Sequence, residues 1–212
     1  MSIFLLLPVL FLSIILHEFA HGYVAYRLGD NTAYVSGRLT LNPISHVDPI
    51  GTIVVPAVCW LFGWPLFGWA KPVPINPLRF PSPRRDMGKT AFAGPAANLL
   101  LAVLGAALLK VSLLLHSFLG ASLLQTLVYM LQYGILINIF LAIFNLIPIP
   151  PLDGGRVVSA LLPLKMSLQY EHLFRRYGLW IVFVLILSGA VKYLILPPTY
   201  FLVNVLAKIF GL

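Results

Sequence analysis

Long apolar runs dominate this chain of 212 residues, and several reach the roughly 20 residues that a helix needs to cross a bilayer. Only 9% of the residues are charged, whereas a soluble domain of this size carries about 25%. The polar side chains are too few to coat a surface that faces water, so most of the surface must face lipid. The length suffices for one domain with about four to six membrane passages.

Four apolar runs predict spanning helices, at residues 3–28, 90–115, 121–147 and 178–196. We expect Pro197-Pro198 to end the last of these, because proline breaks the hydrogen-bond pattern of a helix. Residues 199–212 are also apolar but are too short to cross comfortably.

Two segments between the first and second spans predict other structures. Glycine and proline interrupt residues 50–70, which form either a broken spanning helix or a re-entrant segment. Two short runs of strand-forming residues flank Ser36-Gly37, which predicts a β-hairpin. The fold class is therefore an all-α polytopic membrane protein with about four to six transmembrane or re-entrant helices and a small membrane-associated β-hairpin or sheet. We expect a single domain over 1–212, with a core from about 10 to 165 and C-terminal helices over 166–212.

The formal net charge of +8 comes from basic residues in short loops. Such residues orient a chain in the membrane. The sequence has no basic stripe interleaved with aromatic residues, so we expect no nucleic-acid partner. The loops at 71–89 and 148–177 are strongly basic and are expected on the cytoplasmic side. Arg27 and Arg38 predict the same side for residues 27–48, and two adjacent loops on one side require residues 50–70 to re-enter rather than cross. The N-terminal run lacks a basic start and a convincing cleavage site, so it is interpreted as a retained span. We expect a multi-pass protein of the cell (inner) membrane.

Residues 17 to 21 read H-E-F-A-H, an H-E-x-x-H sequence within the first apolar run. On a helix, His17 and His21 lie one turn apart on the same face, so both imidazoles can bind one metal ion. Glu18 is rotated by about 100° from His17, where it can act as base on a metal-bound water. Ionisable side chains in a spanning helix cost several kcal/mol without a partner, which favours a metal site over a self-paired His–Glu cluster.

A catalytic zinc ion usually takes three protein ligands and leaves one position open for water. Asp153 is the best candidate for the third ligand, because three prolines within 148–151 fix the course of the chain just beyond a predicted span. A surface Asp-Gly turn is the alternative interpretation. His46 and Asp48 stay open as other third ligands, whereas Asp30 is interpreted as a turn after the first helix.

The H-E-x-x-H sequence together with N-L-I-P-I-P-P-L-D-G at 145–154 resembles the site-2 protease family of intramembrane zinc metalloproteases, peptidase family M50. G-P-A-A-N at 94–98 resembles that family's G-P-x-x-N segment, and the similarity covers roughly residues 10–165. The resemblance implies one zinc ion per chain, bound by His17, His21 and Asp153, with Glu18 as the general base.

Two asparagines are predicted as substrate or oxyanion residues by the same resemblance. Asn145 would help to hold the substrate carbonyl or its oxyanion, and Asn98 would be a polar core residue near the site. The hairpin and the loop at 50–70 match membrane-associated strands that receive an unwound substrate in this family. We expect a compact form without a PDZ or CBS domain.

The predicted function is that of a zinc metalloendopeptidase that cleaves peptide bonds in or near transmembrane segments of substrate proteins, in contact with the lipid bilayer. The active site is expected towards the cytoplasmic side. Two alternatives use the same residues without hydrolysis, namely a membrane metal transporter or sensor, and a pseudoprotease that binds helices. A transporter should carry further ionisable residues along a route through the membrane.

Overall fold

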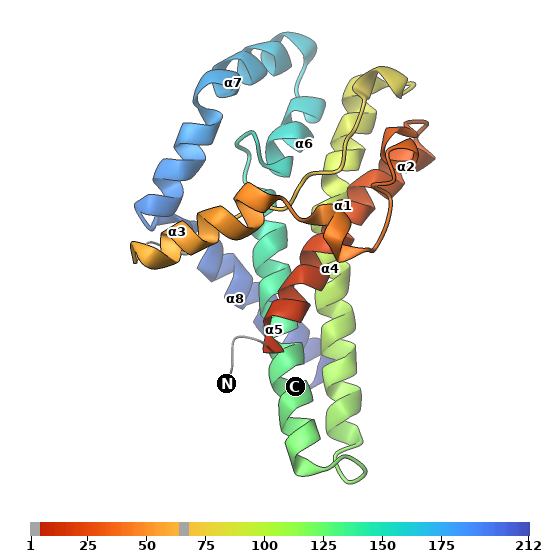
Figure 1. The fold of residues 1–212 in the computed structure, drawn as a ribbon, viewed down its shortest axis with the longest axis vertical. Coiled ribbons are helices and arrows are strands. Elements are labelled where there is room, and N and C mark those ends of the chain that lie inside the picture. The colour runs from red at the N-terminus through yellow and green to blue at the C-terminus, as the bar shows by residue number, and fades with distance from the viewer. Residues whose placement is uncertain (1–4, 64–67) are drawn as a thin grey trace.

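The computed structural model describes residues 5–63 and 68–212, and within them four helices are long and apolar enough to cross a membrane. These are α1 (Leu7–Arg27), α4 (Pro83–Leu114), α5 (Ala121–Asn145) and α8 (Ala190–Phe210). α4 and α5 lie side by side as an antiparallel pair, α1 crosses them, and α8 packs on α5 (Figure 1). The chain is a multi-pass membrane protein, as its apolar runs predict.

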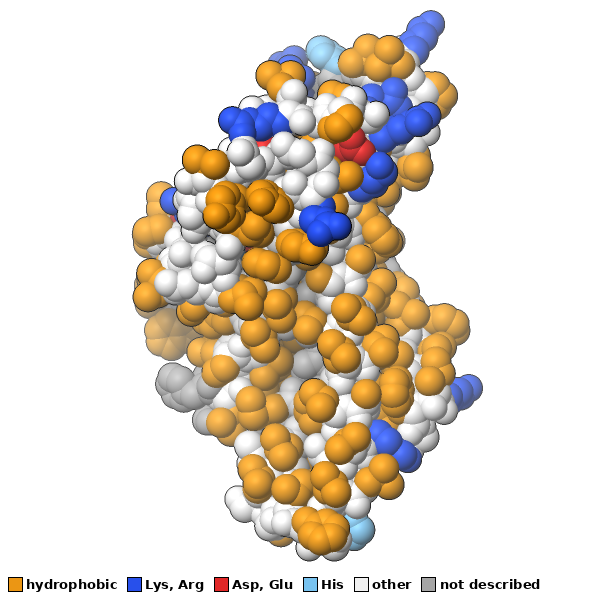
Figure 2. Space-filling view, turned by 90° about the vertical axis from the view of Figure 1, so that its right-hand side faces the viewer, with side chains coloured by type: hydrophobic (Ala, Val, Ile, Leu, Met, Phe, Trp, Pro, Cys, Tyr) orange, Lys and Arg blue, Asp and Glu red, His pale blue; other side chains and the backbone are white. Residues whose placement is uncertain are grey.

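Shorter elements gather around one end of this bundle. They are α2 (Thr32–Val35), α3 (Val55–Leu61), α6 (Asp153–Leu161), α7 (Leu164–Leu187), a π-helical stretch Pro49–Val54, and 3-10 turns at Pro43–His46 and Pro77–Arg79. α6 packs against α4, whereas α7 arches away from the bundle and α3 runs sideways from it (Figure 1). Lys and Arg side chains gather mostly at this end of the molecule, above a broad hydrophobic middle (Figure 2).

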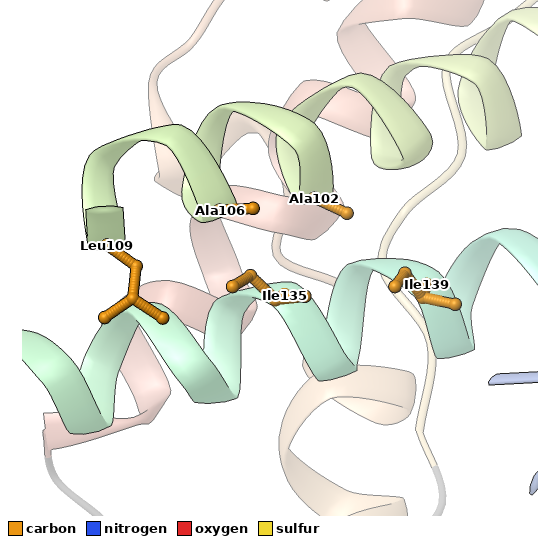
Figure 3. Packing of buried hydrophobic residues seen from close by; sticks show 5 residues of the cluster. All are labelled: Ala102, Ala106, Leu109, Ile135 and Ile139. Carbon is orange, nitrogen blue, oxygen red and sulfur yellow. The ribbon is translucent and has the colours of Figure 1, made fainter. Parts of the chain in front are cut away.

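The contact between α4 and α5 is built from small residues on one helix and branched residues on the other. Ala102, Ala106 and Leu109 of α4 face Ile135 and Ile139 of α5, and all five are buried (Figure 3). In lipid the hydrophobic effect does not drive helices together, because lipid tails are as apolar as the helix surfaces. Close packing of this kind therefore holds spanning helices together.

The predicted β-hairpin around Ser36-Gly37 is wrong. No strand occurs among the residues that the structure describes, and Tyr34 and Val35 lie in α2 instead. The amide of Ser36 donates to the carbonyl of Thr32, and the amide of Arg38 donates to that of Ala33. These local bonds close a helical turn, so the segment has no free edge with which to pair as a hairpin.

The last predicted span is also misplaced. α7 ends at Leu187 and α8 begins at Ala190, because Gly189 adopts a left-handed conformation with φ of 70°. Pro197 and Pro198 lie inside α8 rather than at its end. Prolines are tolerated within spanning helices, where neighbouring groups and local adjustments compensate for the two missing amide donors.

The segment that joins α1 to α4 returns to the end of the bundle from which it starts. α1 ends and α4 begins at the same end of the molecule (Figure 1). The re-entrant interpretation of residues 50–70 agrees with this course for the described part, while 64–67 lie outside the described residues. Residues 1–4, at the start of the first predicted span, also lie outside them.

Candidate metal centre

Three potential metal ligands converge where α6 meets α1. Nε2 of His17 and Nε2 of His21 lie 3.0 Å apart on one face of α1, as the spacing of four residues predicts. Oδ2 of Asp153 lies 3.2 Å from Nε2 of His17 and 3.3 Å from Nε2 of His21. Within the described residues these side chains form a group able to hold a metal ion.

The outer nitrogens of both imidazoles are held by acceptors on α4. Nδ1 of His17 donates to Oδ1 of Asn98 at 2.5 Å, and Nδ1 of His21 donates to the carbonyl oxygen of Thr90 at 2.7 Å. The orientation of Asn98 is fixed because its Nδ2 donates to the carbonyl of Ser13 at 3.3 Å. With a proton on each Nδ1, both Nε2 atoms turn a lone pair towards Asp153.

These three inward-facing atoms fit a zinc ion. Ligand atoms about 2 Å from a common ion in tetrahedral geometry lie about 3.3 Å apart, close to the separations found here. Oδ2 of Asp153 is buried and has no hydrogen-bond partner. Three electron-pair donors without a cation between them would repel, and two imidazoles with a carboxylate are a donor set that zinc accepts.

A tight turn between α5 and α6 places Asp153. A Cβ on Gly155 would lie 2.5 Å from the nitrogen of Pro150, so only glycine allows α6 to start so close to the proline segment. The hydroxyl of Tyr170 on α7 donates to the carbonyl of Pro148 at 2.8 Å. The carboxylate is thus directed at α1 from a turn that is held on both sides.

A cavity of about 170 Å³ opens beside the three ligands. Its polar lining consists of His17, Glu18, His21, Asn145, Asp153 and Arg156. Oε2 of Glu18 accepts a hydrogen bond of 2.9 Å from the amide of Val73. Because Val73 stands between two prolines, it carries the sole amide donor of 72–74. One carboxylate oxygen of Glu18 is thereby held while the residue lines the cavity.

The structure separates the two asparagines that were predicted together. Asn145 lines the cavity, and its Nδ2 donates to the carbonyl of Leu141 in its own helix at 3.0 Å. Asn98 has no exposed surface and lies behind His17, away from the cavity lining. Nδ2 of Asn98 also donates to Oδ1 of Asn138 at 2.8 Å. The geometry of Asn98 therefore suits positioning of an imidazole rather than contact with a substrate.

The other candidates for a third ligand are engaged elsewhere. Nε2 of His46 bonds to the carbonyl of Thr40, and Oδ1 of Asp48 accepts from two amides at the start of the π-helical stretch. Asp30 is fully buried rather than a surface turn, and it accepts the amide of Asn76 at 2.6 Å. Burial raises the pKa of Asp30, but hydrogen bonds from Thr32 and Asn76 outweigh it and lower the pKa overall.

Comparison with known proteins assigns this chain to a family. The model of "Peptidase family M50" matches residues 110–187, which include Asp153. "Putative zinc metalloprotease YwhC" of Bacillus subtilis is 38% identical over 192 residues, covering 89% of this chain and 82% of the relative. The chain belongs to peptidase family M50, the site-2 protease family.

Two further M50 relatives are longer than this chain. "Putative zinc metalloprotease Rip2" of Mycolicibacterium smegmatis is 31% identical over 183 residues, which are 85% of this chain and 66% of the relative. Rip2 of Mycobacterium tuberculosis is 35% identical over 147 residues, which are 67% of this chain and 51% of the relative. No solved structure matches the chain. The resemblance that the motifs indicate is thus confirmed, and the M50 protein is a member of a metalloprotease family.

Several residues at the site of this M50 protein had no predicted role there, although Gly94 belongs to the G-P-A-A-N sequence at 94–98. A Cβ on Gly94 would lie 2.6 Å from Nε2 of His17, so Gly94 lets α4 approach the imidazoles. Its spacing of four from Asn98 was the available signal, since it places both on one helix face. Arg156, three residues after Asp153, could have been found in the same way. Thr90 and Val73 act through backbone atoms, for which side-chain identity gives almost no signal.

Proposed function

We propose that this chain is an intramembrane zinc endopeptidase that hydrolyses peptide bonds in or near transmembrane segments of substrate proteins. One observation carries the proposal. His17, His21 and Asp153 converge on a point beside Glu18, in a cavity at the basic end of a bundle of four apolar helices. The names of the relatives, zinc metalloproteases of family M50, support the same function.

One zinc ion per chain, held by His17, His21 and Asp153, would polarise the scissile carbonyl and lower the pKa of a water molecule. Glu18 accepts the proton of that water as its oxygen attacks the carbonyl carbon. Glu18 then donates the proton to the leaving amine as the C–N bond breaks, which yields a carboxylate and an amine. The amide of Val73 keeps Glu18 turned towards the cavity during both transfers.

Two asparagines have separate parts in this proposal. Asn145 uses one N–H within its own helix, and its second N–H is available to the carbonyl oxygen of a substrate in the cavity. Asn98 acts through His17, because its Oδ1 accepts the Nδ1 proton and fixes the tautomer that turns Nε2 inward. Asn98 is therefore a positioning residue, and Asn145 contacts the substrate.

The proposed orientation places the cavity towards the cytoplasm in the cell membrane. Basic residues gather around the end of the bundle that carries the cavity, and such residues favour the cytoplasmic side (Figure 2). We take residues 1–212 as one domain, since α8 packs on α4 and α5 of the core. The substrate enters from the bilayer and must unwind locally, because a helix shields its own peptide bonds.

Two features argue against the alternative functions. Below the metal centre, the described spans bury the neutral side chains of Asn98, Asn138 and Ser13, followed by an apolar cluster, rather than a line of ionisable groups. A metal route through the membrane would need such groups. Glu18 lines the cavity next to the ligands, and a helix-binding pseudoprotease has no need of it.

The test uses purified protein reconstituted with single-span model membrane proteins. The wild type should contain one zinc ion per chain, cleave within or near the span, lose activity to a chelator and regain it with zinc. Glu18→Gln should keep the zinc and lower the cleavage rate by at least about 100-fold, because it removes the proton acceptor. Undiminished cleavage by Glu18→Gln would refute the role of this residue, and a wild type without stoichiometric zinc would refute the proposal as a whole.

A further inference from the structure

Arg156 is a cation at the mouth of the cavity whose role the proposed reaction leaves unassigned. It stands three residues after Asp153 on α6, about one helical turn away, which places both side chains on the same face. Among the described residues, Arg156 is the one lysine or arginine that lines the cavity, and it is exposed.

The chain offers Arg156 no counter-charge. All six Asp and Glu residues lie in the described ranges, and no ion pair joins any of them to Arg156. Asp30 and Asp86 are buried among their own partners, Asp48 caps a helix, and Glu171 accepts a bond from Ser159. The two remaining acids, Glu18 and Asp153, belong to the candidate metal centre. Any anionic partner of this exposed guanidinium therefore comes from outside the chain.

The charge balance of the cavity also favours an incoming anion. A divalent ion balances the two carboxylates of Glu18 and Asp153, and Arg156 then leaves the lined space with one net positive charge. The guanidinium presents a planar fork of donors that matches the two oxygens of a carboxylate. The other lining residues are the two histidines, the neutral amide Asn145 and apolar residues such as Val73, and none of them carries a negative charge.

We propose that Arg156 binds a carboxylate of the substrate beside the scissile bond and so determines specificity. This inference rests on the proposed function. Two sources supply the same chemistry, namely an acidic side chain next to the cleaved bond and a free C-terminal carboxylate of a substrate that has already been shortened. Arg156 acts on substrate choice, whereas Glu18 and the metal ligands act on the reaction itself.

Small hydroxamate probes test this inference without a known substrate, because the hydroxamate binds the zinc ion directly. Three matched peptide hydroxamates are needed. The first carries a free C-terminal carboxylate, the second an amidated C-terminus with a glutamate side chain, and the third is amidated with glutamine in place of glutamate. Their dissociation constants are measured by calorimetry on the zinc-loaded protein in detergent.

At least one carboxylate probe should bind wild-type protein about 10- to 100-fold more tightly than the neutral probe, as expected for a charged hydrogen bond. The carboxylate that gains affinity identifies the source. Arg156→Gln should abolish the preference, and Arg156→Lys should keep part of it, since lysine retains charge but not the fork. Arg85→Gln is the matched control, because Arg85 is exposed but does not line the cavity, and it should leave the preference unchanged.

The outcomes separate failure of this inference from failure of the proposed function. If no probe binds the wild type, the metal centre is wrong and the inference falls with it. If the neutral probe binds but the carboxylate probes bind equally well, the role of Arg156 is overturned while the metal centre stands. A preference for the carboxylate probes that survives in Arg156→Gln also overturns the role of Arg156. If the single defect of Arg156→Gln is weaker binding to phosphatidylglycerol vesicles, lipid is the partner and the substrate role is overturned as well.

Discussion

α4 and α5 pack against each other in two different ways along their length. Near the cavity, Asn98 of α4 donates to Asn138 of α5, and Nδ2 of Asn138 donates to the hydroxyl of Ser13 on α1. One turn further along α4, Ala102 begins the apolar cluster, in which Ile135 is also buried (Figure 3). Directional hydrogen bonds therefore occupy the half of the interface that orients His17, and shape alone serves the other half.

The difference between the halves follows from what each must hold. A hydrogen bond is strong only over a narrow range of angles, so a network of them fixes one orientation of an imidazole. Apolar packing tolerates substitutions that conserve volume, so it holds two helices together without selecting a single side-chain direction. If this comparison is correct, changes in the polar half should alter zinc affinity, and changes in the apolar half should alter stability alone.

The largest expected effect is that of removing a ligand at the polar end. Asp153→Ala should weaken zinc binding by more than about 100-fold, since loss of a direct ligand exceeds the 10- to 100-fold typical of an outer-shell partner. The measurement is competition with a chromogenic zinc chelator. The variant should remain folded by circular dichroism. Zinc affinity equal to that of the wild type would remove Asp153 from the site.

The next effect tests the polar network itself. Asn98→Ala removes the acceptor of the His17 Nδ1 proton and should weaken zinc binding by about 10- to 100-fold. Asn98→Asp keeps an acceptor for that proton and should restore much of the affinity, although it loses the donation to Asn138. If both variants lose zinc equally, the contribution of Asn98 is structural rather than directed at His17.

A pair of glycines on α4 compares the two halves most directly. A Cβ at Gly94 would overlap both imidazoles, whereas one at Gly105 would lie 3.2 Å from Cγ1 of Ile135. Overpacking costs about 1–3 kcal/mol, so Gly94→Ala should weaken zinc binding by about 5- to 150-fold. Gly105→Ala should leave zinc affinity unchanged. Similar zinc affinities for the two variants would show that the halves do not differ as proposed.

The smallest effect belongs to the apolar cluster. Ile139 is 1% exposed, and Ile139→Val removes one methylene group from its packing. The free energy of unfolding should fall by about 0.5–1.5 kcal/mol, measured by detergent-induced unfolding, with zinc affinity unchanged. A loss of zinc affinity here would mean that the packing below the network also positions the imidazoles.

The amino-acid sequence alone determined the features that depend on residues close together along the chain. A spacing of four residues in a helix places His17 and His21 on one face, whatever the rest of the fold, and long apolar runs require lipid. Asp153 was predicted from its position after a proline segment and from the family resemblance, and the structure brings it to both imidazoles. The convergence of these side chains is thus predictable where a residue belongs to a local pattern or a family motif.

Only the tertiary structure decided which distant groups meet. Asn98 was predicted only as a polar core residue near the site, and the packing of α4 on α1 decides that it faces His17 across 81 residues of sequence. The predicted hairpin and the predicted end of a span at Pro197-Pro198 failed for a related reason. The preference of a few residues for a strand is weak, and local hydrogen bonds can override it. The tendency of proline to end a helix is likewise overridden within a spanning helix. Contacts between remote segments depend on the sum of all packing in the bundle, which short patterns do not contain.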